Sequence, residues 1–529
     1  MSVRTTIVLL LALSTLAFLV GCGSSSPKAV PPPSGGFNNS NFSGTYVFSS
    51  TGSDGSGAFL TVVGDLVANG TGGITGGTFD LADGITGVST NNAITSGSYR
   101  VTADGRGLAT LKTASATITL DFVLTSNSHG LVTEFDGNGT GSGTLDLQPA
   151  AVAQTALAGS YSFSISGVGS SNVSYATVGS ITLDASGTAT AGVEDINNGG
   201  GATTNQAIST SSSILVGSGT APGTAHIAAG AGTSYAFDVY AIDSTHFKLI
   251  ETDGLLLLSG DAFTQGTSIP SGQFVYTMAG SNNSNVAIGA VPLFSGGYFT
   301  NTSGTITAGL QDFNDGGTVS ASGITGITGS ITALAGGRSQ LSFTGFVNGA
   351  ANDVPGNYTF AAYPFSANGI AGLQLLEIDG LGVTSGAAFV QTNTTLASGQ
   401  GYGMNLSGIN SGNGFGSFEE DDIAEFVTTS SGFTGIVDLN DQGNINPGKS
   451  LSGTYTAPSG GRGTATSNFF NGNFYVINGS TLLFLETDSN QVGLGVIEQQ
   501  GSSASPGAAQ SAASMLHAAV PHTALRRKR

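Results

Sequence analysis

Cysteine, tryptophan and charge are scarce in this chain. Of 529 residues one is cysteine and none is tryptophan, and Asp, Glu, Lys and Arg together make up 9%. A single cysteine excludes an internal disulfide, so the folded parts must be held together by packing and hydrogen bonds. Beyond the N-terminal segment, no apolar run approaches the roughly 20 residues of a membrane-spanning helix without Gly, Ser or Asp.

Basic side chains are the scarcer of the two charges. The chain has 13 Lys and Arg against 32 Asp and Glu, a formal net charge of −19. Nucleic-acid binding needs clustered basic side chains, so no nucleic-acid partner is expected, whereas an acidic surface stays soluble and attracts cations. Four of the basic residues end the chain, and this basic end is predicted to be solvated or attracted to anionic lipid. They are Arg526, Arg527, Lys528 and Arg529.

Glycine and short alternating apolar runs are plentiful. Glycine accounts for 84 residues and hydrophobic residues for 39%, which is too apolar for a disordered chain. In the segment 117–124, Ile118, Leu120 and Phe122 alternate with Thr and Asp, a period of two that is typical of half-buried strands. No helical period separates these runs, so the strands are expected to be antiparallel.

The N-terminal segment has the pattern of an export signal. Arg4 precedes an apolar stretch from Ile7 to Val20, and small residues follow. The run Leu19–Cys22 resembles the lipobox of bacterial lipoproteins. That resemblance implies cleavage before Cys22, acylation of its thiol and attachment to a lipid bilayer. Because Gly23 rather than Asp follows, it also implies sorting to the outer membrane of a Gram-negative cell.

Between a Ser/Pro/Gly linker (22–41) and an Ala/Ser-rich tail (501–529) the chain repeats four times. The template E-x-D-x(6)-G-x(4)-Q occurs without a gap in every copy, and it defines units at 42–150, 155–266, 270–393 and 396–500. Each unit has the size of an independent domain. The Glu, Asp and Gln positions are Glu134, Asp136 and Gln148; Glu251, Asp253 and Gln265; Glu377, Asp379 and Gln391; Glu486, Asp488 and Gln500.

A second marker, G-x-x-D, also recurs once in each unit. In three copies an Asn follows the Asp by two residues, as Asn197, Asn314 and Asn440. Asp and Asn at strand ends commonly bond their own turn backbone, and this is the predicted role, with Ca²⁺ binding as a minor alternative. The four copies are Gly77/Asp80, Gly192/Asp195, Gly309/Asp312 and Gly435/Asp438.

We predict an all-β protein of four tandem antiparallel domains. The first unit contains about eight strands, beginning near residues 44, 59, 74, 97, 107, 116, 130 and 143. Eight antiparallel strands in sequence can close into an up-and-down barrel, which removes exposed edges. Two-sheet sandwiches are the alternative fold for each unit, and a single propeller made from all the strands is less favoured because the half-units do not repeat cleanly.

The template residues are predicted to be structural. We expect the Glu and Gln to face each other across a hairpin centred about seven residues after the Glu, with the Glu at the end of an inward apolar stripe. A cation held by the E-x-D carboxylates is the functional alternative, but Ca²⁺ takes about six to eight oxygens and the motif supplies too few.

One run of acidic residues is confined to the fourth unit. Glu419, Glu420, Asp421 and Asp422 are adjacent, and such runs are usually exposed loops. This run is also the best weak Ca²⁺ site that the sequence offers, since adjacent carboxylates repel one another unless they are solvated or bound to a metal. No other cofactor is expected.

No catalytic set is recognisable, so the chain is not expected to be an enzyme. His129 and His246 share one repeat position that is Gly or Thr elsewhere, as at a tolerant turn. Three functions remain. The first is a tethered structural or adhesive lipoprotein contacting a cell-surface glycan or protein. The second is a binding protein for a small apolar ligand, a carbohydrate or a cation. A hydrolase is a distant third. The abundant Tyr and Phe favour filled barrels over hollow ones.

Overall fold

Most of the described chain is β-strand, as the alternating apolar runs predict. The computed structural model describes residues 36–501 except 170–172, 219–220, 283–290, 321, 348–353, 368 and 411–417. The helices in these ranges are short 3₁₀ turns: η1 (Asn39–Asn41), η2 (Gln154–Leu157), η4 (Gly230–Gly232) and η5 (Ala335–Gly337). None of the helices described is long and apolar enough to cross a membrane.

The strands form four consecutive groups, which we number as barrels 1 to 4. Barrel 1 contains β1 (Ser43–Asp54), β2 (Phe59–Asn69), β3 (Gly73–Asp83), β4 (Gly87–Ala93), β5 (Ser96–Val101), β6 (Arg106–Lys112), β7 (Thr117–Leu124), β8 (His129–Glu134) and β9 (Gly139–Gln148). Barrel 2 contains β10 (Gly159–Val168), β11 (Ser174–Leu183), β12 (Ala189–Asn198), β13 (Gly201–Ala207), β14 (Ser213–Leu215), β15 (Gly223–Ala228), β16 (Ser234–Ala241), β17 (His246–Glu251) and β18 (Leu257–Thr264).

The second half of the chain repeats this order. Barrel 3 contains β19 (Gly272–Asn282), β20 (Val291–Thr302), β21 (Thr305–Asp315), β22 (Thr318–Val319), β23 (Ile324–Thr325), β24 (Thr328–Ala333), β25 (Ser339–Phe346), β26 (Gly356–Ala367), β27 (Ile370–Glu377) and β28 (Gly382–Val390). Barrel 4 contains β29 (Gly401–Asn410), β30 (Phe418–Thr428), β31 (Gly432–Asp441), β32 (Asn444–Tyr455), β33 (Arg462–Ser467), β34 (Asn471–Val476), β35 (Thr481–Glu486) and β36 (Gln491–Gln499).

Each group closes on itself with antiparallel pairing. In barrel 1, β1 pairs with both β2 and β9, and β3 completes the circle through β5. Barrel 2 closes through isolated bridges, including Thr188 to Ser213. The predicted fold of four eight-stranded barrels is therefore confirmed, and the sandwich alternative is wrong. The sequence missed β4, a short extra strand beside β3.

The template glycine permits this closure. Gly143, Gly260 and Gly386 lie on the last strand of their barrels, opposite the first strand. A Cβ at any of these positions would lie within 2.1 Å of a backbone oxygen of that first strand. Because that distance is impossible for real atoms, the first and last strands can approach this closely only with glycine at these points.

Aromatic side chains fill the barrel interiors. In barrel 1 Phe42 packs on Tyr46, Tyr99 and Phe122, with ring centroids 4.4–5.0 Å apart. The interior of barrel 4 leaves an apolar cavity of only about 30 Å³, beside Phe426. The inward stripes therefore form four separate packed cores, one in each barrel.

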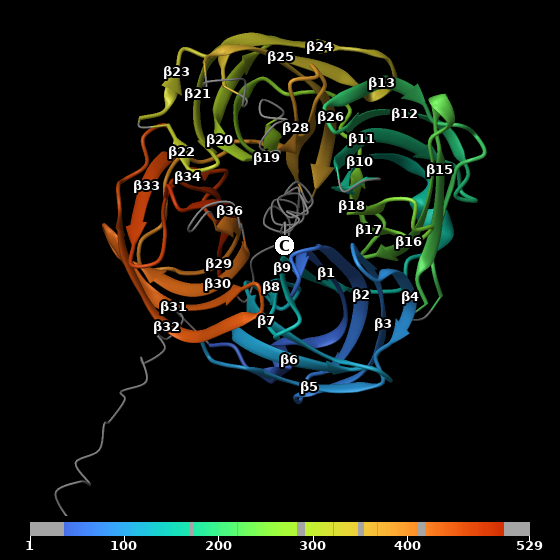
Figure 1. Cartoon of the computed structure of the whole chain (residues 1–529), viewed down its shortest axis with the longest axis vertical. Helices are drawn as coiled ribbons and strands as arrows, with labels where there is room; N and C mark the ends of the chain where they lie inside the picture. Colours follow the sequence, from blue (N-terminus) through green and yellow to red (C-terminus); the bar gives the residue numbers. More distant parts are fainter. Residues whose placement is uncertain are drawn as a thin grey trace, which may run out of the picture.

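The four barrels are arranged in a closed ring, with barrel 4 returning to barrel 1 (Figure 1). In every contact the second strand of one barrel packs against the last strands of the next. We name these contacts interface 1/2 (β2 on β16–β18), 2/3 (β11 on β26–β28), 3/4 (β20 on β34–β36) and 4/1 (β30 on β7–β9). The contacts are head-to-tail, and such contacts form a ring when the rotation closes.

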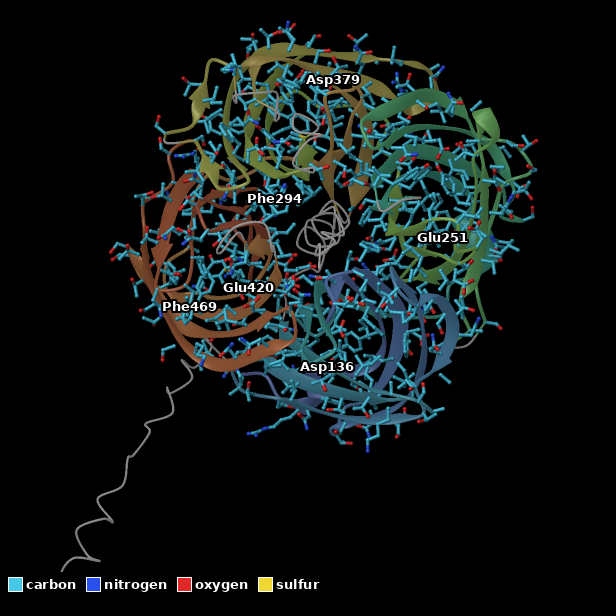
Figure 2. All side chains as sticks on the ribbon, in the orientation of Figure 1. Asp136, Glu251, Phe294, Asp379, Glu420 and Phe469 are labelled. Carbon is cyan, nitrogen blue, oxygen red and sulfur yellow. The ribbon has the colours of Figure 1, made fainter. Side chains whose placement is uncertain are left out.

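One apolar cluster joins all four barrels within the ring. It includes Leu131 of barrel 1, Phe263 of barrel 2, Phe294 of barrel 3 and Leu494 of barrel 4, all buried. Figure 2 shows Phe294 between barrels 3 and 4, on the side toward the middle of the ring. The sequence pattern identified four units, but this shared cluster makes them a single packed assembly.

Candidate functional site

The Asp of G-x-x-D lies at the interface between barrels, which the sequence did not predict. At interface 3/4, Asp312 on β21 is fully buried. Its Oδ2 accepts hydrogen bonds from the Tyr475 hydroxyl at 2.6 Å and from Arg462 Nε at 2.6 Å, and its Oδ1 accepts one from Arg462 Nη2 at 2.8 Å. A buried carboxylate paired with a guanidinium and a phenol forms a strong, directional contact between two barrels.

Interface 2/3 repeats this arrangement. Asp195 Oδ2 accepts from the Tyr363 hydroxyl and from Arg338 Nε, both at 2.6 Å. Its Oδ1 accepts from the backbone amide of Asn205, a left-handed residue in the bulge between β12 and β13, at 2.9 Å. One carboxylate therefore caps its own barrel and binds the next. A backbone bond of the predicted kind is present, but it is one of the three hydrogen bonds named here.

The other two interfaces each lack one partner. At interface 1/2, Asp80 accepts from the Tyr240 hydroxyl at 2.7 Å, and the register of β15 on β16 puts Pro222 beside Tyr240, where the other barrels have Arg. At interface 4/1, Asp438 is 3.5 Å from Arg106 Nη1, and Val123 stands where the others have Tyr. The scarcity of basic residues was the signal in the sequence that could have pointed to these contacts, since Arg106, Arg338, Arg462 and Lys248, four of the 13, pair with an Asp of another barrel.

The Asn that follows the Asp binds the E-x-D turn of the next barrel. At interface 3/4, Asn314 Nδ2 donates to the backbone oxygens of Glu486, Asp488 and Gln491 at 3.2, 3.0 and 2.7 Å, while Oδ1 accepts from Gly317. Asn197 and Asn440 bind the carbonyls of the corresponding Glu in the same way. Ala82 occupies this position at interface 1/2, so that turn lacks the Asn clamp.

The template Gln also contacts the next barrel, so its predicted pairing with the Glu is wrong. The β8–β9 hairpin turns directly after the E-x-D, and its register places Thr133 opposite Ser142, leaving Glu134 and Gln148 at opposite ends of the hairpin. Gln148 Nε2 donates to the carbonyl of Ala241 in barrel 2 at 2.6 Å. The same bonds recur from Gln391 to Val476 and from Gln500 to Leu124.

Gln265 is the one template Gln for which no such bond is found. Its counterpart carbonyl, Pro364, instead accepts from the Gly266 amide at 2.9 Å and the Ser162 hydroxyl at 2.6 Å. The carbonyl that accepts from Gln at the other interfaces therefore accepts from other groups of barrel 2, so interface 2/3 keeps a hydrogen bond at this point.

The template Glu is the last residue of the strand before the hairpin turn in each barrel, and the Asp caps that turn. Glu251, Glu377 and Glu486 are 0–1% exposed and Glu134 is 8% exposed. Burial raises the pKa of Glu134 to about 8, with Asp136 and Asp421 adding to the shift. The Asp accepts backbone amides of its own hairpin region: Thr119 and Asn138 for Asp136, Leu255 for Asp253, Thr359 and Leu381 for Asp379, and Asn471 for Asp488.

The acidic run of the fourth unit is not an exposed loop. It lies in β30, where Glu419, Asp421 and Asp422 are at most 5% exposed. Glu419 and Asp421 face barrel 1, where they accept hydroxyls of Ser53, Thr140 and Ser142 at 2.6–2.7 Å. Successive residues of a strand point to opposite faces, so Glu420 and Asp422 face the inside of barrel 4. The four carboxylates therefore cannot surround one Ca²⁺.

Among the residues that the structure describes, no group of three or more His, Cys, Asp or Glu is placed to hold a metal ion. Burial raises the pKa of Asp421 to about 8, and Glu419 adds to the shift. Glu419 and Asp421, but not the whole run, therefore serve as hydrogen-bonding carboxyl groups at interface 4/1.

The two repeated histidines are buried in ion pairs rather than placed at tolerant turns. His129 contacts Asp146 at 2.7 Å and Glu498 of barrel 4 at 3.1 Å. Burial alone would lower the pKa of His129, but Glu498 and Asp146 outweigh it and raise the pKa to about 10. His246 contacts Asp261 at 2.6 Å. The His129–Glu498 pair adds to interface 4/1, where the Asp–Arg–Tyr set is incomplete, whereas His246 and Asp261 both belong to barrel 2.

Cys22, the 22–41 linker up to residue 35 and the basic C-terminus lie outside the described residues. Lipidation at Cys22 therefore stays a prediction.

The comparisons with known proteins assign no family. No family model matches the chain, and no curated protein matches it. Solved structures with some likeness include a double mutant of the vaccine antigen transferrin binding protein B from Haemophilus parasuis Hp5, at 9% identity and a TM-score of 0.19 over 73% of this chain and 84% of that one. A single mutant of the same antigen has 10% identity and a TM-score of 0.20 over 75% and 86%.

A third solved structure, intact Ap-TbpB with its N and C lobes, has 10% identity and a TM-score of 0.16 over 71% of this chain and 85% of that one. At such low identities and TM-scores, function has to be argued from the residues of this chain.

Proposed function

We propose that this chain is an exported lipoprotein, anchored through acylated Cys22 in an outer membrane, whose ring of barrels serves as a rigid structural or adhesive platform. The observation that carries this proposal is where the repeated residues are used. The Asp, Asn and Gln markers bind the next barrel and the E-x-D Asp caps a turn, so these repeated residues serve assembly rather than chemistry. A platform that must keep its shape needs such interfaces, and no enzymatic role is proposed.

Two polar strands supply surface for a partner. β4 (GVSTNNA) and β13 (GATTNQA) occupy the same place in barrels 1 and 2, and most of their residues are exposed. Hydroxyl and amide side chains on a fixed strand can hydrogen-bond a glycan or a protein without a large change in shape. We therefore propose a cell-surface glycan or protein as the partner of this face.

The anchor is tested by replacing the thiol. In a bacterial host grown with an alkyne-tagged fatty acid, the wild-type chain is expected to take up the tag and to sediment with membranes, whereas Cys22→Ser loses both properties. A matched control adds Ser25→Cys to the Cys22→Ser variant, which restores a thiol outside the lipobox and is expected to stay unlabelled. Tag retained in Cys22→Ser would contradict the anchor.

The platform role is tested separately by adherence. Cells producing the wild-type chain are expected to settle or adhere faster than cells producing Cys22→Ser. Equal adherence, with both chains present in equal amounts, would contradict the adhesive role and leave the lipid anchor standing.

A further inference from the structure

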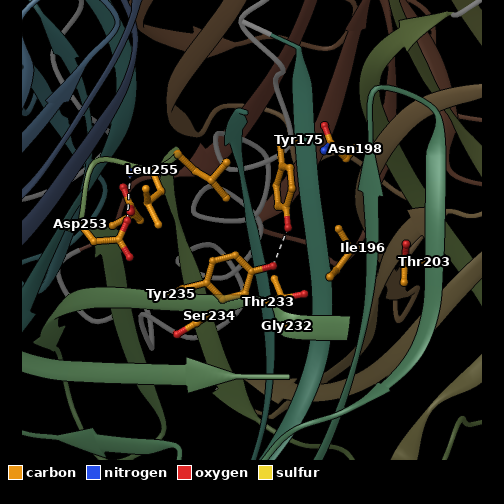
Figure 3. Close-up of a pocket in the computed structure, with 12 residues that line it drawn as sticks. Tyr175, Ile196, Asn198, Thr203, Gly232, Thr233, Ser234, Tyr235, Asp253 and Leu255 are labelled. Carbon is orange, nitrogen blue, oxygen red and sulfur yellow. Dashed lines mark hydrogen bonds between the residues drawn. The ribbon is translucent and has the colours of Figure 1, made fainter. Parts of the chain in front are cut away.

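One barrel mouth differs from the others, and it contains a pocket. The pocket lies at the E-x-D end of barrel 2 and has a volume of about 400 Å³, within the usual range for small-ligand sites of about 300–1,000 Å³. Its lining combines hydroxyls, one amide, two carboxyls, two tyrosines and three aliphatic side chains. Figure 3 shows Tyr175 and Tyr235 meeting between the Asp253 turn on one side and Ile196 and Thr203 on the other.

The pocket is found where the ring leaves a turn without the Asn clamp. At interfaces 2/3, 3/4 and 4/1 an Asn of the preceding barrel binds the carbonyl of the template Glu, but at interface 1/2 that position is Ala82. The turn after Glu251 therefore lacks this contact, and Leu255 in it is 71% exposed. A turn with fewer contacts can adjust to a ligand more readily than one that is held.

The polar groups at the base of the pocket are arranged in two pairs. The hydroxyls of Tyr175 and Tyr235 are 2.5 Å apart. Glu251 shares a side-chain hydrogen bond with Asp253. Glu251 is 1% exposed, yet its Oε2 has no hydrogen-bond partner in the described part of the chain. A buried acceptor without a donor is costly, and a ligand hydroxyl would supply that donor.

The charge of the pocket selects against ionic ligands. Burial raises the pKa of Glu251 to about 9, and the bond to Asp253 adds to the shift, so Glu251 is protonated near neutral pH. Asp253 is ionised, and its carboxylate already accepts hydrogen bonds from the protonated Glu251 and from the Leu255 amide. The negative charge of Asp253 would repel a phosphate or a carboxylate. An ammonium group would gain little from it, because the carboxylate is already hydrogen-bonded. A neutral molecule with several hydroxyls is not repelled and does not need the charge.

We propose that the mouth of barrel 2 binds a neutral saccharide, with the Glu251 carboxyl oxygen and the Tyr175–Tyr235 pair accepting and donating hydrogen bonds to its hydroxyls and with Leu255 and Ile196 covering its apolar face. This site uses none of the residues that join the barrels, although Thr203 at its rim belongs to β13, a strand of the proposed partner surface. The sugar-binding test and the Cys22→Ser tests use different variants, so their failures are distinguishable.

Saturation-transfer NMR on the full chain tests the site with glucose, N-acetylglucosamine and maltose as probes. At least one is expected to show saturable transfer that fits a single site. Glu251→Ala is expected to weaken binding about tenfold or more, since a tenfold change corresponds to about 1.4 kcal/mol. Glu251→Gln, which keeps a donor and an acceptor, is expected to bind within about threefold of wild type, on the same scale.

Matched variants separate loss of the site from loss of the fold. Glu377→Ala removes the same template carboxyl in barrel 3, where Oε2 already accepts from Thr384, and it is expected to leave binding unchanged. Thr203→Trp fills the exposed rim of the pocket and is expected to abolish binding while the melting temperature stays the same. No transfer to any of the three sugars, equal loss in Glu251→Ala and Glu377→Ala, or saturable binding of butylamine but of no sugar would overturn the proposal.

Discussion

Interfaces 3/4 and 4/1 perform the same task with different chemistry. At interface 3/4 the buried Asp312 meets a cation and a phenol. At interface 4/1 the corresponding Asp438 lies 3.5 Å from Arg106 and shares a side-chain hydrogen bond with Asp121. The contact is completed by carboxyl groups such as Asp421, which accepts two hydroxyls of barrel 1. The repeated fold therefore fixes where barrels touch, while the local side chains decide whether ion pairs or neutral acids hold them.

The largest expected effect is a selective response of interface 4/1 to alkaline pH. Burial is the first cause that raises the pKa of Glu134, Asp421 and Glu425, each to about 8. The folded pKa values lie above the unfolded ones, so the stabilisation is complete below about pH 4 and is lost as the pH rises through about 8. At interface 3/4 the partners of Asp312 are Arg462 and Tyr475, although burial also raises the pKa of Glu486 at the end of β35.

Hydrogen exchange measured between pH 5 and pH 9, corrected for the intrinsic rate, checks this difference. Amides of β30 and β9 are expected to lose protection with rising pH, while those of β20 and β34 keep it. The combined variant Glu134→Gln, Asp421→Asn and Glu425→Gln should remove the difference. Equal loss at both interfaces would refute the distinction.

Removing one Asp should break interface 3/4 more severely than interface 4/1. Asp312→Ala leaves Arg462 and Tyr475 buried without their acceptor, and breaking such a buried pair costs about 3–5 kcal/mol. Asp438→Ala removes a long contact to a partly exposed Arg106, a bond shared with the Asp121 carboxyl and a bond from the Gly448 amide. It should cost less, because Arg106 keeps Asp104 as an acceptor. Urea unfolding followed by tyrosine fluorescence measures both, with the exposed turn residue Asp184→Ala as control. A greater loss for Asp438→Ala would reverse the ranking.

The smallest expected effect separates Tyr240 from Tyr475. Tyr240 is the hydroxyl donor to Asp80 at an interface without the Arg, so Tyr240→Phe should cost about 1–3 kcal/mol, the penalty for an unsatisfied buried acceptor. Tyr475→Phe leaves Arg462 on Asp312 and should cost less. Thermal unfolding of the two variants, which remove the same single atom, makes the comparison directly. Equal costs would show that the Arg does not compensate.

The fold could be predicted because its determinants are local. Alternation such as that of residues 117–124 identifies a half-buried strand without any knowledge of distant residues, and glycine turns delimit it. The four E-x-D copies fixed the number of units. Of the strands in the first unit, only β4 was missed. It is a seven-residue polar strand that pairs on one side, so it lacks the alternating apolar residues by which a strand is recognised.

The interfaces could not be predicted because they join residues far apart in sequence. Asp195 and Tyr363 are 168 positions apart, and no local period relates them. The charge of Glu419–Asp422 led to a wrong prediction, because a run of carboxylates is typical of a solvated loop. In the structure, hydroxyls of another barrel, such as those of Thr140 and Ser142, donate hydrogen bonds to these carboxyl groups. The pocket of barrel 2 lies beside a turn that no Asn binds, because Ala82 occupies the Asn position. The sequence could not show this, since the contact between that position and the turn is known only from the assembled ring.

Because the ring is closed, the chain could begin at a different barrel and still form the same four interfaces. The Phe37 amide bonds the Ala103 carbonyl at 3.0 Å, and the Gly501 amide bonds the Thr125 carbonyl at 2.9 Å, so both ends of the ring are fastened to barrel 1. Interface 4/1 is the one contact made without a direct peptide connection between neighbouring barrels. A circular permutation that joined residue 501 to residue 36 and opened the connection near residue 152 would keep every interface, and it would transfer that role to interface 1/2.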